Sequence, residues 1–156
     1  MSRRPARPSH DEILWLQDYL PYRIAVTASR MLRAAAQVHK RMPDPLTTPQ
    51  WRILAILANF EPLRATELAR ISMLDKVAIS RALAELERRG FVLRTKTVDD
   101  RRAAKVTLTA EAWRYYANLV PEMKRQEQVL RQAVRPDELR LLFDMLARFD
   151  RLPLSK

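Results

Sequence analysis

Apolar residues recur at helical spacing in the first third of the chain. Between Pro21 and Met42 their separations alternate between four and three residues. The apolar positions are Ile24, Ala28, Met31, Ala35, Val38 and Met42. This spacing places apolar side chains on one face of an α-helix. The pattern predicts a long helix over residues 21–42, with proline in its first turn and the run Pro43-Asp44-Pro45 beyond its end. A shorter helix is expected over residues 11–19.

Start and stop signals mark three further helices. Thr48 is a candidate N-cap followed by proline at the first helical position, and its helix is expected to end before Pro62. A short helix is expected over residues 65–71. Asp75 is the candidate N-cap of the next helix, which ends at Gly90, the only glycine of the chain. A residue just past a helix end often needs a positive φ, which glycine adopts without steric cost.

The spacing of apolar residues changes after Gly90. Residues 91–96 and 103–108 are typical of two short β-strands. The segment between them, residues 97–102, is highly charged and is expected to form the tip of a hairpin. The sequence therefore predicts a small β-hairpin with a basic tip.

Two helices complete the chain. Thr109 is expected to cap a long helix in which Pro121 introduces a kink, and Pro136 opens a last helix. The chain thus has a long helix, a second helix, a short helix, a helix that ends at glycine, a basic hairpin and long helices. This is the order of a winged helix-turn-helix. The predicted fold class is mainly α-helical with a small β-hairpin wing.

Residue counts exclude several kinds of chemistry. With one glycine in 156 residues, the chain lacks the Gly-rich loops that hold nucleotide phosphates. It has no cysteine, which excludes thiolate metal sites and cysteine nucleophiles. Its two histidines, His10 and His39, are far apart in the sequence. The sequence shows neither paired carboxylates nor a Ser–His set of the kind that forms a catalytic centre. We therefore expect no enzyme activity, no metal and no cofactor.

The chain is strongly basic. Its formal net charge is +11 and its isoelectric point is near 10.8, which favours a polyanionic partner. The excess charge is spread along the chain, so ordinary solubility is an alternative explanation. No apolar run approaches the roughly 18 residues of a membrane span, and the basic N-terminus leads into charged residues. A cytoplasmic protein without a membrane partner is expected.

The helix that follows Asp75 carries the main candidate DNA contacts. Ile79 and Leu83 are expected to anchor it against the preceding short helix, so that its other face enters the major groove of double-stranded DNA. Arg81 is the candidate for a bidentate contact with guanine, whereas Lys76 and the first backbone N–H groups are expected to meet phosphate. The candidate contacts on this helix are Lys76, Val77, Ala78, Ser80 and Arg81.

The hairpin tip suggests a second DNA contact. Arg101 and Arg102 are suited to a narrow minor groove, where the negative potential is focused. Asp99 and Asp100 would repel phosphate if they were free, so we expect Asp100 to brace one of the arginines. The alternative is that this charged turn is only a solvated hairpin tip.

Seven short motifs are spread through the middle of the chain. They are Leu46-Thr47-Thr48-Pro49-Gln50-Trp51, Glu67-Leu68-Ala69, Leu74-Asp75-Lys76, Ser80-Arg81, Leu86-Glu87-Arg88-Arg89-Gly90-Phe91-Val92, Asp100-Arg101-Arg102-Ala103 and Leu108-Thr109. Over about residues 20–150 the chain resembles the MarR family of bacterial transcriptional regulators. The Asp-Arg-Arg run followed by Leu-Thr is the most specific part. The resemblance implies a homodimer that binds a pseudopalindromic operator, usually as a repressor. A small, often aromatic, anionic ligand would release it from the DNA.

Three positions depart from the pattern of that family. Met73 lies in the turn of the helix-turn-helix, where glycine is frequent, and Ala112 stands where the family commonly has glycine. Arg64 occupies a position where a serine or threonine cap is usual. The first two departures suggest an altered turn and an altered helix start. None of the three removes a DNA-contacting group.

The resemblance also divides the chain into regions. Residues 1–10 are expected to be a flexible tail, 11–45 N-terminal dimerisation helices, 46–109 the winged helix-turn-helix core and 110–156 C-terminal dimerisation helices. A single copy leaves the apolar stripes of its terminal helices without enough core to cover them, and a two-fold partner supplies the rest. The recognition helices of such a dimer lie roughly 34 Å apart, one turn of DNA. The alternative is that the stripes pack on one another within a monomer.

Aromatic residues suggest a site for a small-molecule effector. The candidate ligand-binding residues are Tyr19, Tyr22, Arg23, Trp51, Trp113 and Tyr116. With Arg52 nearby in the sequence, they are suited to a flat carboxylate or a thioester. The alternative is that these aromatic rings are plain core. For the whole protein, the alternative function is an architectural one, in which it binds duplex DNA without sequence choice and without an effector.

Overall fold

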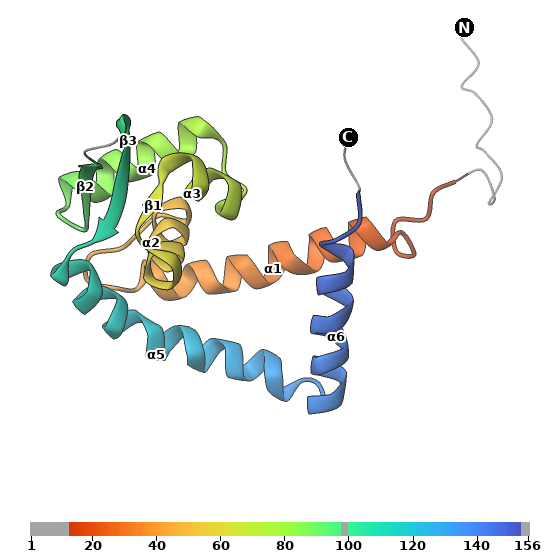
Figure 1. Ribbon diagram of the computed structural model, residues 1–156. Helices are drawn as coiled ribbons and strands as arrows, with labels where there is room; N and C mark the ends of the chain where they lie inside the picture. Colours follow the sequence, from red (N-terminus) through yellow and green to blue (C-terminus); the bar gives the residue numbers. More distant parts are fainter. Residues whose placement is uncertain (1–12, 98–99, 154–156) are drawn as a thin grey trace, which may run out of the picture. The chain divides into compact units, whose positions relative to one another are not determined.

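The computed structural model describes residues 13–97 and 100–153 (Figure 1). For residues 96–103 the side chains lie outside the description, whereas the backbone of the strands in this region is included. The chain divides into two compact units, Met1–Gln37 and Val38–Lys156.

The first unit contains most of helix α1 (Leu20–Lys40), whose last three residues belong to the second unit. The long helix predicted over residues 21–42 is confirmed and ends two residues early. The shorter helix predicted over residues 11–19 is wrong for the residues described. There the chain forms a turn, in which the Trp15 carbonyl accepts hydrogen bonds from the N–H groups of Asp18 and Tyr19. None of residues 13–19 is buried, so packing does not offset the cost of helix nucleation there, as it does for the short helix α3 (Ala65–Ser72).

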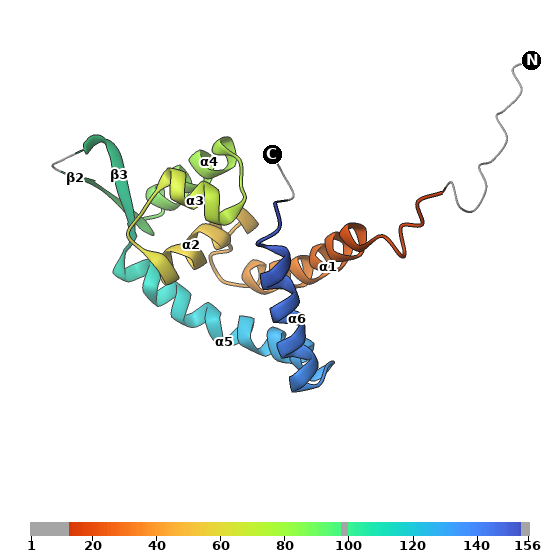
Figure 2. The same cartoon turned by 45° about the vertical axis from the view of Figure 1, so that its right-hand side comes forward.

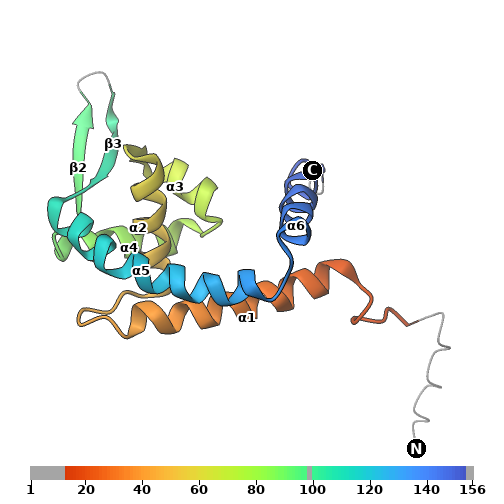
Figure 3. The ribbon, with the colours of Figure 1, turned by 90° about the horizontal axis from the view of Figure 1, so that it is seen from below.

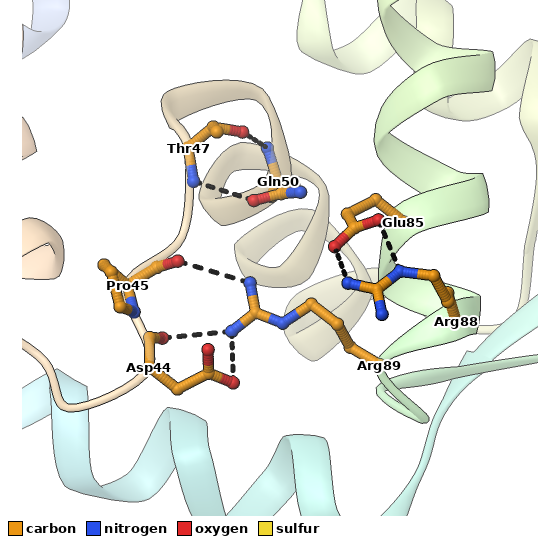
Figure 4. Close-up of polar contacts among 7 residues, drawn as sticks. All are labelled: Asp44, Pro45, Thr47, Gln50, Glu85, Arg88 and Arg89. Atoms are coloured by element: carbon orange, nitrogen blue, oxygen red, sulfur yellow. Dashed lines mark hydrogen bonds and ion pairs between the residues drawn. The ribbon is translucent and has the colours of Figure 1, made fainter.

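Helix α2 (Thr48–Phe60) begins with a capping box. The Thr47 hydroxyl accepts a hydrogen bond from the Gln50 N–H, and the Gln50 side-chain carbonyl accepts one from the Thr47 N–H at 2.8 Å (Figure 4). The N-cap is therefore Thr47, and the prediction of Thr48 is wrong by one residue. Two adjacent threonines offer the same hydroxyl, and the glutamine three residues after Thr47 decides between them.

Helices α3 (Ala65–Ser72) and α4 (Lys76–Arg88) form the helix-turn-helix. Met73, between them, has a φ of 56°, in the left-handed region that favours glycine. Asp75 is the N-cap of α4, as predicted, and Gly90 follows the end of that helix with a φ of 70°. At the start of α3, the Glu67 carboxylate accepts a hydrogen bond from the Arg64 N–H at 2.7 Å. This bond satisfies a donor where the sequence lacks the usual serine or threonine.

A three-stranded antiparallel sheet forms the wing. Strand β1 (Leu63–Arg64) pairs with β3 (Asp100–Leu108), which pairs with β2 (Val92–Thr97), so the strand order is β1-β3-β2. The two predicted strands are confirmed, but β3 begins three residues earlier than predicted. The segment between the strands is therefore shorter than the predicted tip at 97–102. The ribbon of β2 and β3 projects from the helices around it (Figures 2 and 3). Strand β1 was not predicted, because its two residues are too few to show the alternation of apolar and polar positions that is typical of a strand.

Helices α5 (Ala110–Gln132) and α6 (Pro136–Phe149) follow the wing. Thr109 caps α5, as predicted, by accepting a hydrogen bond from the Ala112 N–H at 3.1 Å. Ala112 is fully buried in the core. Pro121 lies inside α5 and does not end the helix.

The core of the second unit surrounds α4. Leucine and isoleucine side chains of α2, α3 and α4 lie against the sheet and the first turn of α5. The most deeply buried of them are Ile53, Leu54, Leu57, Leu68, Leu83 and Leu86. Burying one such side chain contributes roughly 1.5–3 kcal/mol, so this cluster fixes the orientation of α4. Among the described residues, no helix combines the length and the apolar character needed to cross a membrane.

We predict that Met73→Gly stabilises the protein by about 1 kcal/mol, because the left-handed conformation costs a side-chain-bearing residue about that much. The methionine side chain is 87% exposed, so its removal loses little packing. Urea denaturation of both proteins measures the difference. Met73→Ala, which keeps the Cβ atom, is the control and is expected to leave stability nearly unchanged. Equal or lower stability of the glycine variant would contradict the prediction.

Candidate nucleic-acid interface

Helix α4 has one buried face and one exposed face. Ile79, Leu83 and Leu86 are at most 3% exposed and hold the helix in the core. Of the five candidate DNA contacts on α4, four are exposed and one, Ala78, is half-buried. The exposed four are Lys76, Val77, Ser80 and Arg81. The structure thus brings two cations and a hydroxyl together on one accessible helix face.

The N-terminus of α4 is already capped by a carboxylate. Asp75 Oδ1 accepts a hydrogen bond from the Ala78 N–H at 2.7 Å. That N–H is therefore occupied and is not free for a phosphate, which limits the predicted role of the first backbone N–H groups. Ala78, half-buried at this cap, has less room for a base contact than its neighbours have.

An arginine of α2 holds the turn between α3 and α4. Arg52 Nη1 donates a hydrogen bond to the Ser72 carbonyl at 3.1 Å, and the buried Ser72 hydroxyl accepts one from the Leu74 N–H at 3.3 Å. The sequence suggested Arg52 as a ligand partner. Its guanidinium supports the helix-turn-helix through a contact 20 residues away in the chain, and the ligand role stays a prediction.

The wing is joined to α4 by an ion pair. Arg94 of β2 lies 2.9 Å from the Glu87 carboxylate of α4, and both side chains are partly exposed. The candidate wing contacts Asp100, Arg101 and Arg102 begin strand β3, but their side chains lie outside those described, as does Asp99 altogether. The predicted brace between Asp100 and an arginine stays a prediction.

The candidate ligand-binding residues fall into two groups. Trp51, Tyr116 and Trp113 belong to the second unit and form a chain of ring contacts, with centroids 5.8 Å apart for the first pair and 5.9 Å for the second. The others, Tyr19, Tyr22 and Arg23, belong to the first unit. Both of these tyrosines are 42% exposed. The structure therefore brings three of the six residues together.

A buried histidine extends this chain of rings. The His39 ring stacks on Trp51 at 6.4 Å and is 1% exposed. Its Nδ1 lies 2.8 Å from the Leu46 carbonyl oxygen. Because a carbonyl oxygen can only accept a hydrogen bond, Nδ1 carries the proton and acts as the donor. Burial lowers the pKa of His39 below its usual value, which favours the neutral ring at pH 7. No role was predicted for this histidine, because its partners follow only from the fold.

Comparison with known proteins agrees with this architecture. The MarR family model matches residues 46–104, which span the helix-turn-helix and most of the wing. The transcriptional regulator HosA of Escherichia coli is 30% identical, over 60% of this chain and 73% of that protein. The chain belongs to the MarR family. It is therefore a transcriptional regulator of the MarR type and not an enzyme.

Two further relatives extend the comparison of this MarR-family chain. The homoprotocatechuate degradative operon repressor of Escherichia coli is 27% identical, over 71% of this chain and 75% of that repressor. The crystal structure of NadR in complex with 4-hydroxyphenylacetate has a TM-score of 0.75 at 21% identity and covers 96% of this chain and 99% of NadR. That likeness shows the shared fold. MarR regulators bind DNA and commonly dimerise and bind small-molecule ligands.

Proposed function

We propose that this MarR-family protein is a homodimeric repressor that binds a pseudopalindromic operator and is released by a small aromatic anion. The observation that carries the proposal is the exposed face of α4, with Lys76, Ser80 and Arg81 on a helix whose other face is in the core. A helix held this way can enter a major groove without losing its own packing. The relative named as an operon repressor supports the direction of regulation.

Base and phosphate contacts are assigned to different side chains of α4. Arg81 has the forked guanidinium that binds guanine O6 and N7, and its place in the second turn brings it to the base edges. Lys76 lies in the first turn, beside the helix N-terminus, where it meets a phosphate. In the wing, Arg101 and Arg102 enter the adjacent minor groove, as the net charge of +11 and the projecting ribbon support.

The dimer proposal rests on the apolar side chains of α6. In this helix, all of which is described, no residue is buried. Its exposed large apolar residues are Leu141, Leu142, Phe143, Met145 and Leu146. An amphipathic helix that leaves these side chains in water needs a partner surface. A second copy of the chain provides one through a two-fold interface, in which the same patch faces itself.

The ligand proposal rests on the ring contacts of Trp51, Tyr116 and Trp113. Trp113 is 40% exposed, so the chain of rings ends at the surface. An aromatic ring with an exposed edge can pack against an aromatic ligand. The 4-hydroxyphenylacetate bound in NadR and the homoprotocatechuate operon of the named repressor support a hydroxyaryl carboxylate. The roles of Tyr19, Tyr22 and Arg23 remain predictions from the sequence.

Two substitutions on α4 distinguish specific binding from architectural binding. On a duplex selected from a random pool, Arg81→Ala is expected to lose roughly 1–3 kcal/mol of affinity, with little effect on a scrambled duplex. Lys76→Ala is expected to weaken binding to both duplexes equally. It should also reduce the slope of log affinity against log salt concentration by about one. Fluorescence anisotropy across a salt series measures these effects. If the selection recovers no preferred site, or Arg81→Ala leaves the ratio of affinities unchanged, the protein is an architectural binder instead.

The dimer is tested on α6. Light scattering should give the wild-type protein twice its chain mass of 18.3 kDa. Phe143→Glu is expected to reduce that mass to one chain, because a carboxylate in an apolar interface has no partner. Arg148→Glu introduces the same group elsewhere on α6 and should remain dimeric. A wild-type mass of one chain at micromolar concentration would contradict the proposal.

Ligand release is tested with 4-hydroxyphenylacetate and a panel of related aromatic acids and their CoA esters. We expect an active member to change the tryptophan fluorescence and to dissociate the protein from its selected duplex. The neutral amide of the same compound should be weaker, because it lacks the carboxylate. Trp51→Leu should weaken the response, because it removes the ring that lies between His39 and Tyr116. Silence across the panel would count against the effector.

A further inference from the structure

One arginine connects the end of α4 to the segment between α1 and α2, here called the linker (residues 41–47). Arg89 Nη2 forms an ion pair with the Asp44 carboxylate and donates a hydrogen bond to the Asp44 carbonyl at 3.0 Å. Arg89 Nη1 donates another to the Pro45 carbonyl at 3.3 Å. Both ends of the guanidinium thus bind one short stretch of the linker (Figure 4).

The Arg89 side chain is fixed on the other side as well. It is only 11% exposed, and its Cζ lies 5.0 Å from the centroid of the Phe91 ring, which is in the core. Its backbone N–H closes the last turn of α4 by donating to the Glu85 carbonyl at 3.0 Å. A planar guanidinium on an aromatic face, with several acceptors in its plane, has little freedom to reorient.

The linker is held at its far end too. Leu46 is 2% exposed, and its carbonyl accepts the hydrogen bond from His39, in the last turn of α1. Thr47, the next residue, caps α2. Residues 44 and 45, which contact Arg89, are thus followed directly by two residues with fixed contacts of their own.

The adjacent arginine provides a contrast on the same helix. Arg88 is 72% exposed, and its guanidinium binds Glu85, one turn back within α4, at 2.8 Å for Nε. Both partners of that pair belong to α4, and Arg88 interacts with Asp44 only through the longer-range field of its charge. Arg89 spans 44 and 45 residues of sequence to its two linker carbonyls.

We propose that Arg89 is a positioning residue that couples the conformation of the linker to the orientation of α4, and so sets the affinity for specific DNA. The proposal rests on the proposed function, in which α4 reads the operator. By linkage, a linker that favours the DNA-bound orientation of α4 must itself be stabilised when DNA binds. Movement of the linker away from Arg89 would release the end of the recognition helix.

Asp44→Asn gives the sharpest test, because electrostatics and coupling predict opposite results. The substitution removes a negative charge, so charge alone predicts tighter binding to any duplex. Loss of the ion pair with Arg89 instead predicts that affinity for the selected duplex falls by about fivefold or more. Tighter binding of the selected duplex, or no change, would overturn the proposal.

Substitutions of Arg89 separate geometry from charge. Arg89→Lys keeps the charge and loses the fork, and Arg89→Met keeps most of the stem; both should lower affinity for the selected duplex by about fivefold or more. The control Arg88→Met should keep the wild-type ratio of specific to non-specific affinity. Combining Arg89→Met with Asp44→Asn should cost no more than either change alone. Wild-type affinity in Arg89→Lys would overturn the proposal.

Hydrogen exchange provides a measurement that does not depend on the DNA result. In the free protein, Arg89→Met should speed exchange in residues 44–47 while urea denaturation shows the molecule still folded. In the wild type, the selected duplex should slow exchange in the same residues, and in Arg89→Met it should not. Unchanged exchange in the free variant would overturn the coupling even if wild-type DNA binding is confirmed. If the wild-type protein selects no duplex, the proposed function fails, whereas the free-protein measurement still tests the clamp.

Discussion

The structure depends on the burial of one face of α4. Ile79, Leu83 and Leu86 are enclosed by α2, the sheet and the start of α5, and this contact leaves the helix one orientation about its own axis. The polar residues between these apolar ones therefore face water. The sequence therefore specifies the candidate DNA-binding face through the residues that do not touch DNA. A rotation of α4 by one residue would bury Lys76 or Arg81, which is costly without a partner.

Arginines fix the remaining freedom of this helix. Arg52 supports the turn before it, Arg94 ties the wing to its side and Arg89 holds its end to the linker. Arg52 donates to a backbone carbonyl, whereas Arg89 and Arg94 form ion pairs with carboxylates. An Arg–carboxylate pair contributes nothing to the net charge, so the pairs of Arg89 and Arg94 do not reduce the excess of +11. The cations on the exposed face of α4 are more informative about DNA binding than the total charge is.

Local signals in the sequence were enough for most of the fold. Asp75, Thr109 and Gly90 each act within a few residues of a helix end, so their roles follow from short-range chemistry. Contacts between distant segments were missed. Strand β1 exists because Leu63 pairs with Val106, and Arg52 acts on Ser72 because the fold brings them together. The same difference applies to the candidate site. The exposed face of α4 was predictable from the helical spacing of its apolar residues, whereas only three of the six predicted ligand-binding residues come together.

Two kinds of exposed surface on this chain call for two kinds of partner. On α4, the exposed residues are mostly short, polar or cationic, and they remain well solvated until a polyanion replaces the water. On α6, Leu142 and Phe143 are 42% and 52% exposed, and moving such side chains from water to another apolar surface is favourable. DNA offers no such surface in its grooves beyond a few methyl groups. The exposed apolar side chains of α6 therefore favour a protein partner, and the proposed homodimer would cover them while bringing a second α4 to the same duplex.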